Sequence, residues 1–164
     1  MIRELAKSIR EYKKVSIMTP ILVSMEVVME CLIPFIIANL VNQIKAGCEF
    51  QVIAVYGLVL VLMAGISLLF GAWAGNTCST ASCGLAKNLR KDMFYRIQDF
   101  SFANIDRFSP SSLVTRLTTD VTNVQNAYQM VIRIAIRGPI MLVFALVMAL
   151  GISRDLSTIF FIIL

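Results

Sequence analysis

The chain has 164 residues, of which 58% are hydrophobic and 15% are charged, and its mean hydropathy is +0.79. This balance excludes an ordinary water-soluble domain and indicates that lipid surrounds much of the chain. The length allows several bilayer-crossing helices within one domain at most. The formal net charge of +5 does not indicate nucleic-acid binding, because membrane topology explains the basic residues better.

Two membrane spans are predicted in the first half of the chain. Residues 15–41 form an apolar run that is long enough to cross a hydrocarbon core of about 30 Å. Pro20 and Pro34 are expected to bend this helix without ending it. The charged residues before the run, with no small-residue cleavage site after it, argue against a secretory leader. A short polar connection around Gly47 then leads to a second span over residues 52–76.

The second helix is expected to continue beyond the membrane. After residue 76 the chain becomes polar but meets no strong helix breaker before Pro110. Apolar residues recur at three- and four-residue spacing, which is typical of an amphipathic helix in water: Leu85, Leu89, Met93, Ile97 and Phe100. A helix continuous from Val52 to Asn104 would be on the order of 80 Å long, more than twice the hydrocarbon thickness. The sequence therefore predicts a cytosolic helical hairpin over residues 77–137.

The return arm of the hairpin is predicted to lead back into the membrane. Ser109 and Pro110 indicate a turn, and Thr118 to Asp120 offer a new N-cap for a third helix. A third span is expected over residues 138–153, and residues 157–164 begin a fourth. Because the last apolar run stops after eight residues, we expect the sequence to be a fragment of a longer membrane domain.

The basic residues predict the orientation of these spans. Lys45 and Arg154 fall on one side of the membrane in this topology, and the other thirteen basic residues fall on the opposite side. Lys and Arg are enriched in cytoplasmic loops. We therefore expect a multi-pass protein of the cell membrane, with the N-terminus and the hairpin in the cytosol.

The sequence contains no catalytic constellation. It has no His, no glycine-rich phosphate loop and no zinc-type cysteine pair. The four cysteines lie in or beside apolar stretches and are interpreted as small apolar fillers. We predict no catalytic, metal-binding or cofactor-binding residue, and no enzymatic activity for this segment alone.

Two acidic residues lie near the middle of the first span. Glu26 and Glu30 are four residues apart and share one helix face, and each charge costs about 2.5–3.5 kcal/mol on insertion scales. They either line a substrate pathway, where they attract cationic or polar cargo or hold a proton, or bond to polar groups on neighbouring helices. Met25 and Met29 beside them could contact cargo, although plain packing is the commoner role of methionine.

Small residues form a stripe in the second span. Gly71 and Gly75 make a GxxxG pair, a pattern that lets membrane helices approach closely. Helix packing is the favoured interpretation, and the pair by itself does not separate folding from partner binding.

The hairpin resembles a known family. Residues 89–125 read LRKDMFYRIQDFSFANIDRFSPSSLVTRLTTDVTNVQ, and residues 132–150 read IRIAIRGPIMLVFALVMAL. The order LR, FxxIQxxSF, D, SLxxRLTxDV and RxP, at matching spacing, resembles the first intracellular loop and third span of ABC exporters of the six-span, multidrug-resistance type. The resemblance covers residues 85–150, and the two preceding spans agree with it in length and orientation. It implies an all-α membrane domain with long cytosolic helical extensions, of which this chain is the N-terminal part.

The resemblance also implies how the hairpin works. In that family a short coupling helix, here about residues 106–114, is gripped by a nucleotide-binding domain, which is absent from this sequence and would hold ATP and Mg²⁺. The family often has Thr-Gly where this chain has Pro110-Ser111. The implied coupling residues are Asp106, Arg107, Phe108, Ser109, Pro110, Ser111, Ser112, Leu113 and Arg116.

The resemblance further implies the partners and the cargo. Besides membrane lipid and the nucleotide-binding domain, the chain would pair with a second half-transporter, either identical or different, and would export drugs, lipids or peptides. The alternative from another functional class is a noncatalytic membrane scaffold or binding protein, which docks a cytosolic partner through its basic hairpin.

Overall fold

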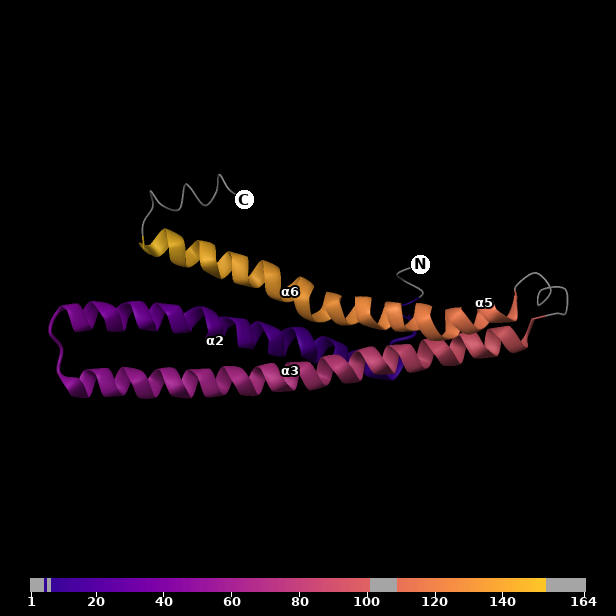
Figure 1. Cartoon of the computed structure of the whole chain (residues 1–164), viewed down its shortest axis with the longest axis horizontal. Coiled ribbons are helices and arrows are strands. Elements are labelled where there is room, and N and C mark those ends of the chain that lie inside the picture. Colours follow the sequence, from indigo (N-terminus) through magenta and orange to yellow (C-terminus); the bar gives the residue numbers. More distant parts are fainter. Residues whose placement is uncertain (1–4, 6, 101–108, 153–164) are drawn as a thin grey trace. The chain divides into compact units, whose positions relative to one another are not determined.

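The structure is a computed structural model that describes residue 5, residues 7–100 and residues 109–152. The described residues are helical apart from short connections, and they contain no strand. In chain order the elements are the 3₁₀ turn η1 (Arg10–Tyr12), α2 (Lys13–Lys45), α3 (Phe50–Gln98), α5 (Pro110–Thr115), the π-helical turn η2 (Arg116–Asp120) and α6 (Val121–Ile152) (Figure 1). The all-α prediction is confirmed.

Three helical segments are long and apolar enough to cross a membrane by length and composition. Within the described ranges they are Arg10–Lys45, Phe50–Gln98 and Ser111–Gly151. At 1.5 Å per residue the 49-residue α3 is roughly 74 Å long, about 2.5 times the hydrocarbon thickness. The expectation that the second helix continues past residue 76 is confirmed. The predicted start of a fourth span, at 157–164, lies outside the described residues, as does residue 153.

Helix α2 contains both prolines and ends in a Schellman motif. Pro20 and Pro34 lie inside the helix, as expected. At its end Gly47 adopts a φ of +81°, which glycine tolerates better than other residues. The amide of Gly47 donates to the Ile44 carbonyl at 3.1 Å, and the amide of Cys48 donates to the Gln43 carbonyl at 3.3 Å. These bonds satisfy two of the last carbonyls and turn the chain toward α3.

The return arm of the hairpin begins earlier than the sequence indicated. Ser109 is the N-cap of α5, and its Oγ accepts a hydrogen bond from the Ser112 amide at 3.3 Å. Proline suits the next position, because its fixed φ is helical and its missing N–H needs no partner there. The predicted N-cap at Thr118 to Asp120 is wrong, since η2 continues the helix through these residues. The Thr118 hydroxyl instead donates to the Val114 carbonyl at 2.8 Å, within the helical run.

The chain divides into two compact units, and each is described by itself. We call residues 1–19 and 75–134 the hairpin unit, and residues 20–74 and 135–164 the span unit. In the hairpin unit Cys78, Ala81 and Ile132 are buried, and Val15 and Tyr128 pack against them. In the span unit the buried residues are Leu22, Val23, Val27 and Ala74, with Cys31, Phe70 and Ile140 packed around them.

Candidate functional site

The two acidic residues of the first span meet a basic residue of α6. Arg137 donates from Nη1 to Oε1 of Glu26 at 3.3 Å and from Nη2 to Oε2 of Glu30 at 2.6 Å. One helical turn separates the two glutamates, so one guanidinium group reaches both carboxylates. We call these three residues the charged cluster. With two carboxylates and one guanidinium, it carries one excess negative charge when all three groups are ionised.

The Glu26 carboxylate is the most buried group of the charged cluster. Its side chain is 10% exposed, against 33% for Glu30 and 35% for Arg137. The Glu26 Oε2 atom is buried and has no hydrogen-bond partner among the residues that the structure describes. A buried carboxylate oxygen without a partner is costly, so its presence requires an explanation.

Gly71 makes room for this carboxylate. A Cβ atom at residue 71 would lie 2.8 Å from Glu26 Oε1, which is closer than real Cβ contacts come, and 3.1 Å from its Cδ, which is tighter than most of them. At Gly75 the nearest atom to such a Cβ is Nη1 of Arg133, at an ordinary 3.7 Å. A side chain at residue 71 would therefore collide with an acidic side chain, whereas one at residue 75 would make an ordinary contact. Helix packing by the GxxxG pair remains a prediction.

The structure places two of the four predicted pathway residues in a common ion-pair cluster, and the other two are not part of it. Glu26 and Glu30 share a partner, which is the arrangement that the second interpretation of these residues describes. Met25 is 49% exposed, and Met29 is partly buried. Substrate contact by any of the four remains a prediction.

Arg137 is the residue of the cluster that sequence analysis missed as a site residue, because it was considered only as a basic residue of the topology and as part of the RxP pattern. The sequence nevertheless contained a signal for this pairing. Two carboxylates in the middle of a span require compensation, and Arg137 is the basic residue that directly precedes the apolar run of the third span.

The hairpin end presents a short helix with an exposed apolar residue. In α5, Ser112 and Leu113 are half-buried and Ser111 is exposed, and the flanking residues Ser109 and Arg116 are exposed as well. Val114 is 59% exposed. Of the predicted coupling residues, Asp106, Arg107 and Phe108 lie outside the described residues, and so does the first part of the predicted helix 106–114.

Side chains of α3 hold this region in place. Arg90 donates from Nε to the Leu117 carbonyl at 3.3 Å and from Nη2 to the Thr122 hydroxyl at 3.2 Å. A small, mainly apolar groove of about 170 Å³ lies between the end of α3 and α5, with Ile97, Phe100 and Leu113 in its lining. The return arm is thus fastened to α3 by both polar and apolar contacts.

Comparison with known proteins points to one family. The family model described as the ABC transporter transmembrane region matches residues 16–164. The chain is 30% identical over 137 residues to the uncharacterized ABC transporter ATP-binding protein YfiB of Bacillus subtilis (strain 168), which covers 84% of this chain and 24% of that protein.

Two further relatives carry similar names. The uncharacterized ABC transporter ATP-binding protein MT1311 of Mycobacterium tuberculosis (strain CDC 1551 / Oshkosh) is 28% identical over 146 residues, 89% of this chain and 25% of that protein. The putative ABC transporter ATP-binding protein MG014 of Mycoplasma genitalium is 28% identical over 109 residues, 66% of this chain and 17% of that protein. The chain spans about a quarter or less of the length of these curated relatives.

Proposed function

The chain belongs to the family of ABC transporter transmembrane regions, and on this premise we propose that it forms the first spans of an ATP-driven exporter. The chain itself is a membrane protein with a transport role, built on three long apolar helices. The proposal adds that the N-terminus and the hairpin lie in the cytosol, where ATP is available. The excess of basic residues in the N-terminal segment and the hairpin supports this orientation.

The single observation that carries the proposal is the exposed apolar residue on the short helix α5, at the end of the hairpin, in a chain of this family. A capped short helix, α5, exposes Val114 at 59%, and Arg90 fastens the turn that follows it to α3. An exposed apolar residue on a rigidly held helix is what a docking partner covers. In our proposal the partner is a nucleotide-binding domain that binds ATP and Mg²⁺, in accord with the names of the relatives, which describe ATP-binding proteins.

Coupling would then follow from the continuity of α3. This helix has no break between Phe50 and Gln98, so a displacement at its end acts on a stiff element that also belongs to the span unit. Two half-transporters, identical or different, would alternate between inward-open and outward-open states. ATP would drive the change because it binds one state more tightly than the other.

The charged cluster supports a preference for cationic cargo. Its excess negative charge and the unpartnered Glu26 oxygen favour a cargo group that brings positive charge or a hydrogen-bond donor. We therefore propose that Glu26 and Glu30 lie on the pathway. Cationic amphipathic drugs or peptides fit this cluster better than anionic lipids.

The test of coupling is a charge placed on α5 in the full-length transporter. In Val114→Asp a carboxylate would be buried without a partner at the docking surface, so we expect at least about tenfold slower ATP-driven transport while ATP binding is retained. The matched control is Asn123→Asp, which places the same carboxylate on the exposed surface of α6 and should transport like the wild type. Wild-type transport by Val114→Asp would refute docking at α5.

A further inference from the structure

The π-helical turn η2 interrupts the return arm between α5 and α6. The Val121 amide, which follows this turn, donates to the Arg116 carbonyl five residues back and to the Thr118 carbonyl. In a regular α-helix its partner would be the Leu117 carbonyl, four residues back. A π turn holds one residue more than the α-helical turn that it replaces, and such turns are frequent at functional sites. The residues before η2 are therefore rotated about the helix axis by about 100° from where an unbroken α-helix would place them.

The burial of α5 shows the effect of this extra residue. Leu113 is half-buried and lines the groove of about 170 Å³ together with Ile97 of α3, whereas Val114 is 59% exposed. Val121 is buried and follows Val114 by seven residues, which is close to two α-helical turns. An unbroken helix would thus turn Val114 to the buried side, into the position that Leu113 holds in the structure. We call the observed arrangement the π register and the unbroken one the α register, and each register has an apolar side chain for the groove.

Arg90 of α3 binds the carbonyl that the Val121 amide does not use. Its Nε donates to the Leu117 carbonyl at 3.3 Å, and its Nη2 donates to the Thr122 hydroxyl at 3.2 Å. One guanidinium group therefore holds residues of both η2 and α6. In the α register the Val121 amide would compete for the Leu117 carbonyl, so the hydrogen bond from Arg90 favours the π register.

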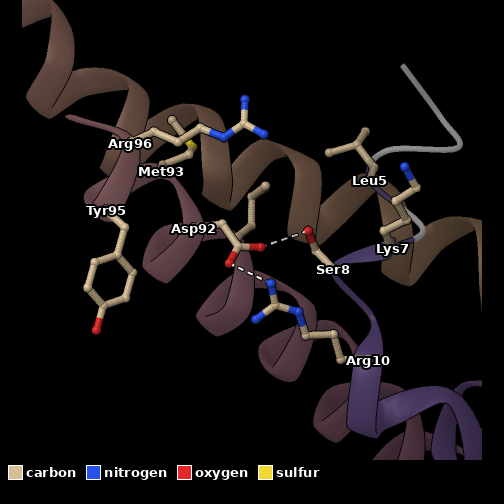
Figure 2. A pocket seen from close by; sticks show the side chains of 9 residues that line it. Leu5, Lys7, Ser8, Arg10, Asp92, Met93, Tyr95 and Arg96 are labelled. Atoms are coloured by element: carbon tan, nitrogen blue, oxygen red, sulfur yellow. Dashed lines mark hydrogen bonds and ion pairs between the residues drawn. The ribbon is translucent and has the colours of Figure 1, made fainter. Parts of the chain in front are cut away.

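The segment of α3 around Arg90 is also held from another side. Asp92 accepts hydrogen bonds from the Ser8 hydroxyl at 3.2 Å and from Nη2 of Arg10 at 2.9 Å (Figure 2). Asn88 donates to the Ser8 carbonyl at 2.9 Å, and both of these residues are buried. Residues two apart on a helix differ by about 200° in direction, so the N-terminal segment contacts a different face of α3 from the one that Arg90 occupies. A change of register is therefore expected to rotate α5 and to leave α3 in place.

We propose that Arg90 is a positioning residue, which holds α5 in the π register and so keeps Val114 on the surface. Loss of its two hydrogen bonds lets α5 rotate by about 100°, and this rotation turns Val114 into the groove and Leu113 toward the position of Ser112. In the α register the docking residue is withdrawn from the surface. This consequence rests on the proposed function, whereas the register itself does not depend on docking, transport or cargo.

The test is disulfide cross-linking in the full-length protein after replacement of its native cysteines. The pair Ile97→Cys with Leu113→Cys reports the π register, and the pair Ile97→Cys with Val114→Cys reports the α register. We expect the first pair to form its disulfide faster when Arg90 is present, and the ratio of the two rates to fall roughly tenfold in Arg90→Gln. The matched control is Lys87→Gln, which removes an exposed cation of the same helix outside the groove and should leave the ratio unchanged.

Deletion of Thr119 separates the register from general stability. With one residue fewer, the hydrogen bond from the Val121 amide to the Arg116 carbonyl becomes an ordinary α-helical bond, and Leu113 stays in the groove without Arg90. In this background Arg90→Gln should no longer change the ratio. A role of Arg90 in stability alone would instead give the same effect with and without the deletion.

The proposal would be overturned by equal rates for the two cysteine pairs when Arg90 is present, or by an unchanged ratio in Arg90→Gln. The same fall of the ratio in Lys87→Gln, or after deletion of Thr119, would also overturn it. The first of these comparisons leaves Arg90 intact, so the test remains decisive even where Arg90→Gln fails to fold. Docking is tested separately by the transport rate of Val114→Asp. Normal transport by that variant would refute docking at α5, and the cross-linking ratio would still decide the register.

Discussion

The contacts inside the span unit differ in kind from the contacts inside the hairpin unit. The span unit buries Val23 and Val27 completely, yet it leaves large apolar side chains such as Val61 and Leu68 at least 70% exposed. The hairpin unit joins its helices by hydrogen bonds between neutral side chains as well as by apolar contacts, whereas the polar links described for the span unit are the ion pairs of the charged cluster. Thr19 donates to Thr77 at 3.1 Å, and Tyr128 donates to Ser16 at 2.8 Å.

In the proposed topology, in which most of the hairpin unit lies outside the membrane, this difference matches two different solvents. In lipid an exposed apolar side chain costs nothing, so apolar contact between helices gives little net driving force, and a polar group without a partner becomes expensive. In water the exposed apolar area is what is minimised, and polar side chains can serve as links between helices. The contrast predicts that stability is most sensitive to changes of charge in the span unit and to changes of side-chain size in the hairpin unit.

The largest effect is expected when the cation of the charged cluster is removed. Arg137→Met leaves two carboxylates unpaired among apolar side chains, and we expect a loss of about 3 kcal/mol in the free energy of unfolding of the full-length protein. The measurement is denaturant unfolding in micelles. An unchanged stability would contradict a structural role for the ion pairs.

A compensating variant separates this structural role from function. Adding Glu26→Gln and Glu30→Gln to Arg137→Met removes all three charges and should restore most of the stability. If the glutamates contact cargo, the restored protein should still transport cationic cargo more slowly than the wild type, with neutral cargo unaffected. Equal transport of both cargoes would remove Glu26 and Glu30 from the pathway.

A smaller effect is expected from a steric change in the hairpin unit. A Cβ atom at Gly84 would lie 2.5 Å from ring carbons Cγ and Cδ2 of Tyr12. These atoms belong to the rigid base of the ring, so the helices must shift, and we expect Gly84→Ala to lower the free energy of unfolding by about 1–3 kcal/mol. If Gly84→Ala matches the wild type in thermal unfolding, then the close packing of Tyr12 on α3 does not contribute to stability.

The smallest effect is expected for the glycine of the span unit. In Gly71→Ala the new methyl group meets Oε1 of Glu26, the end of a flexible side chain that can move by small rotations. We expect a loss of about 1 kcal/mol or less in the free energy of unfolding, and no additional loss when the Glu26 side chain is shortened by Glu26→Ala. Gly75→Ala is the matched control, because its Cβ meets only Arg133 at 3.7 Å. A larger loss in Gly75→Ala than in Gly71→Ala would refute this assignment of the close approach.

The sequence by itself determined the helical class, the three long apolar helices and the continuation of α3 beyond residue 76. These features depend on runs and periodicities within one segment, and intrahelical hydrogen bonds act over four residues. Even so, the local reasoning put a cap at Thr118 to Asp120, where the structure starts the helix at Pro110 after the cap of Ser109. Both segments contain hydroxyl residues that can cap, and only the packed chain shows which of them does so.

The tertiary structure alone decided which side chains meet. Arg137 is 111 residues from Glu26, and Asn88 is 80 residues from the Ser8 carbonyl that it binds. No local sequence pattern predicts these contacts, because they depend on how one helix is rotated about its axis and shifted along it relative to another. The same reason explains why Gly71, Gly75 and Gly84 look alike in the sequence yet differ in the structure. A glycine's role is set by the atom that its missing side chain would have met.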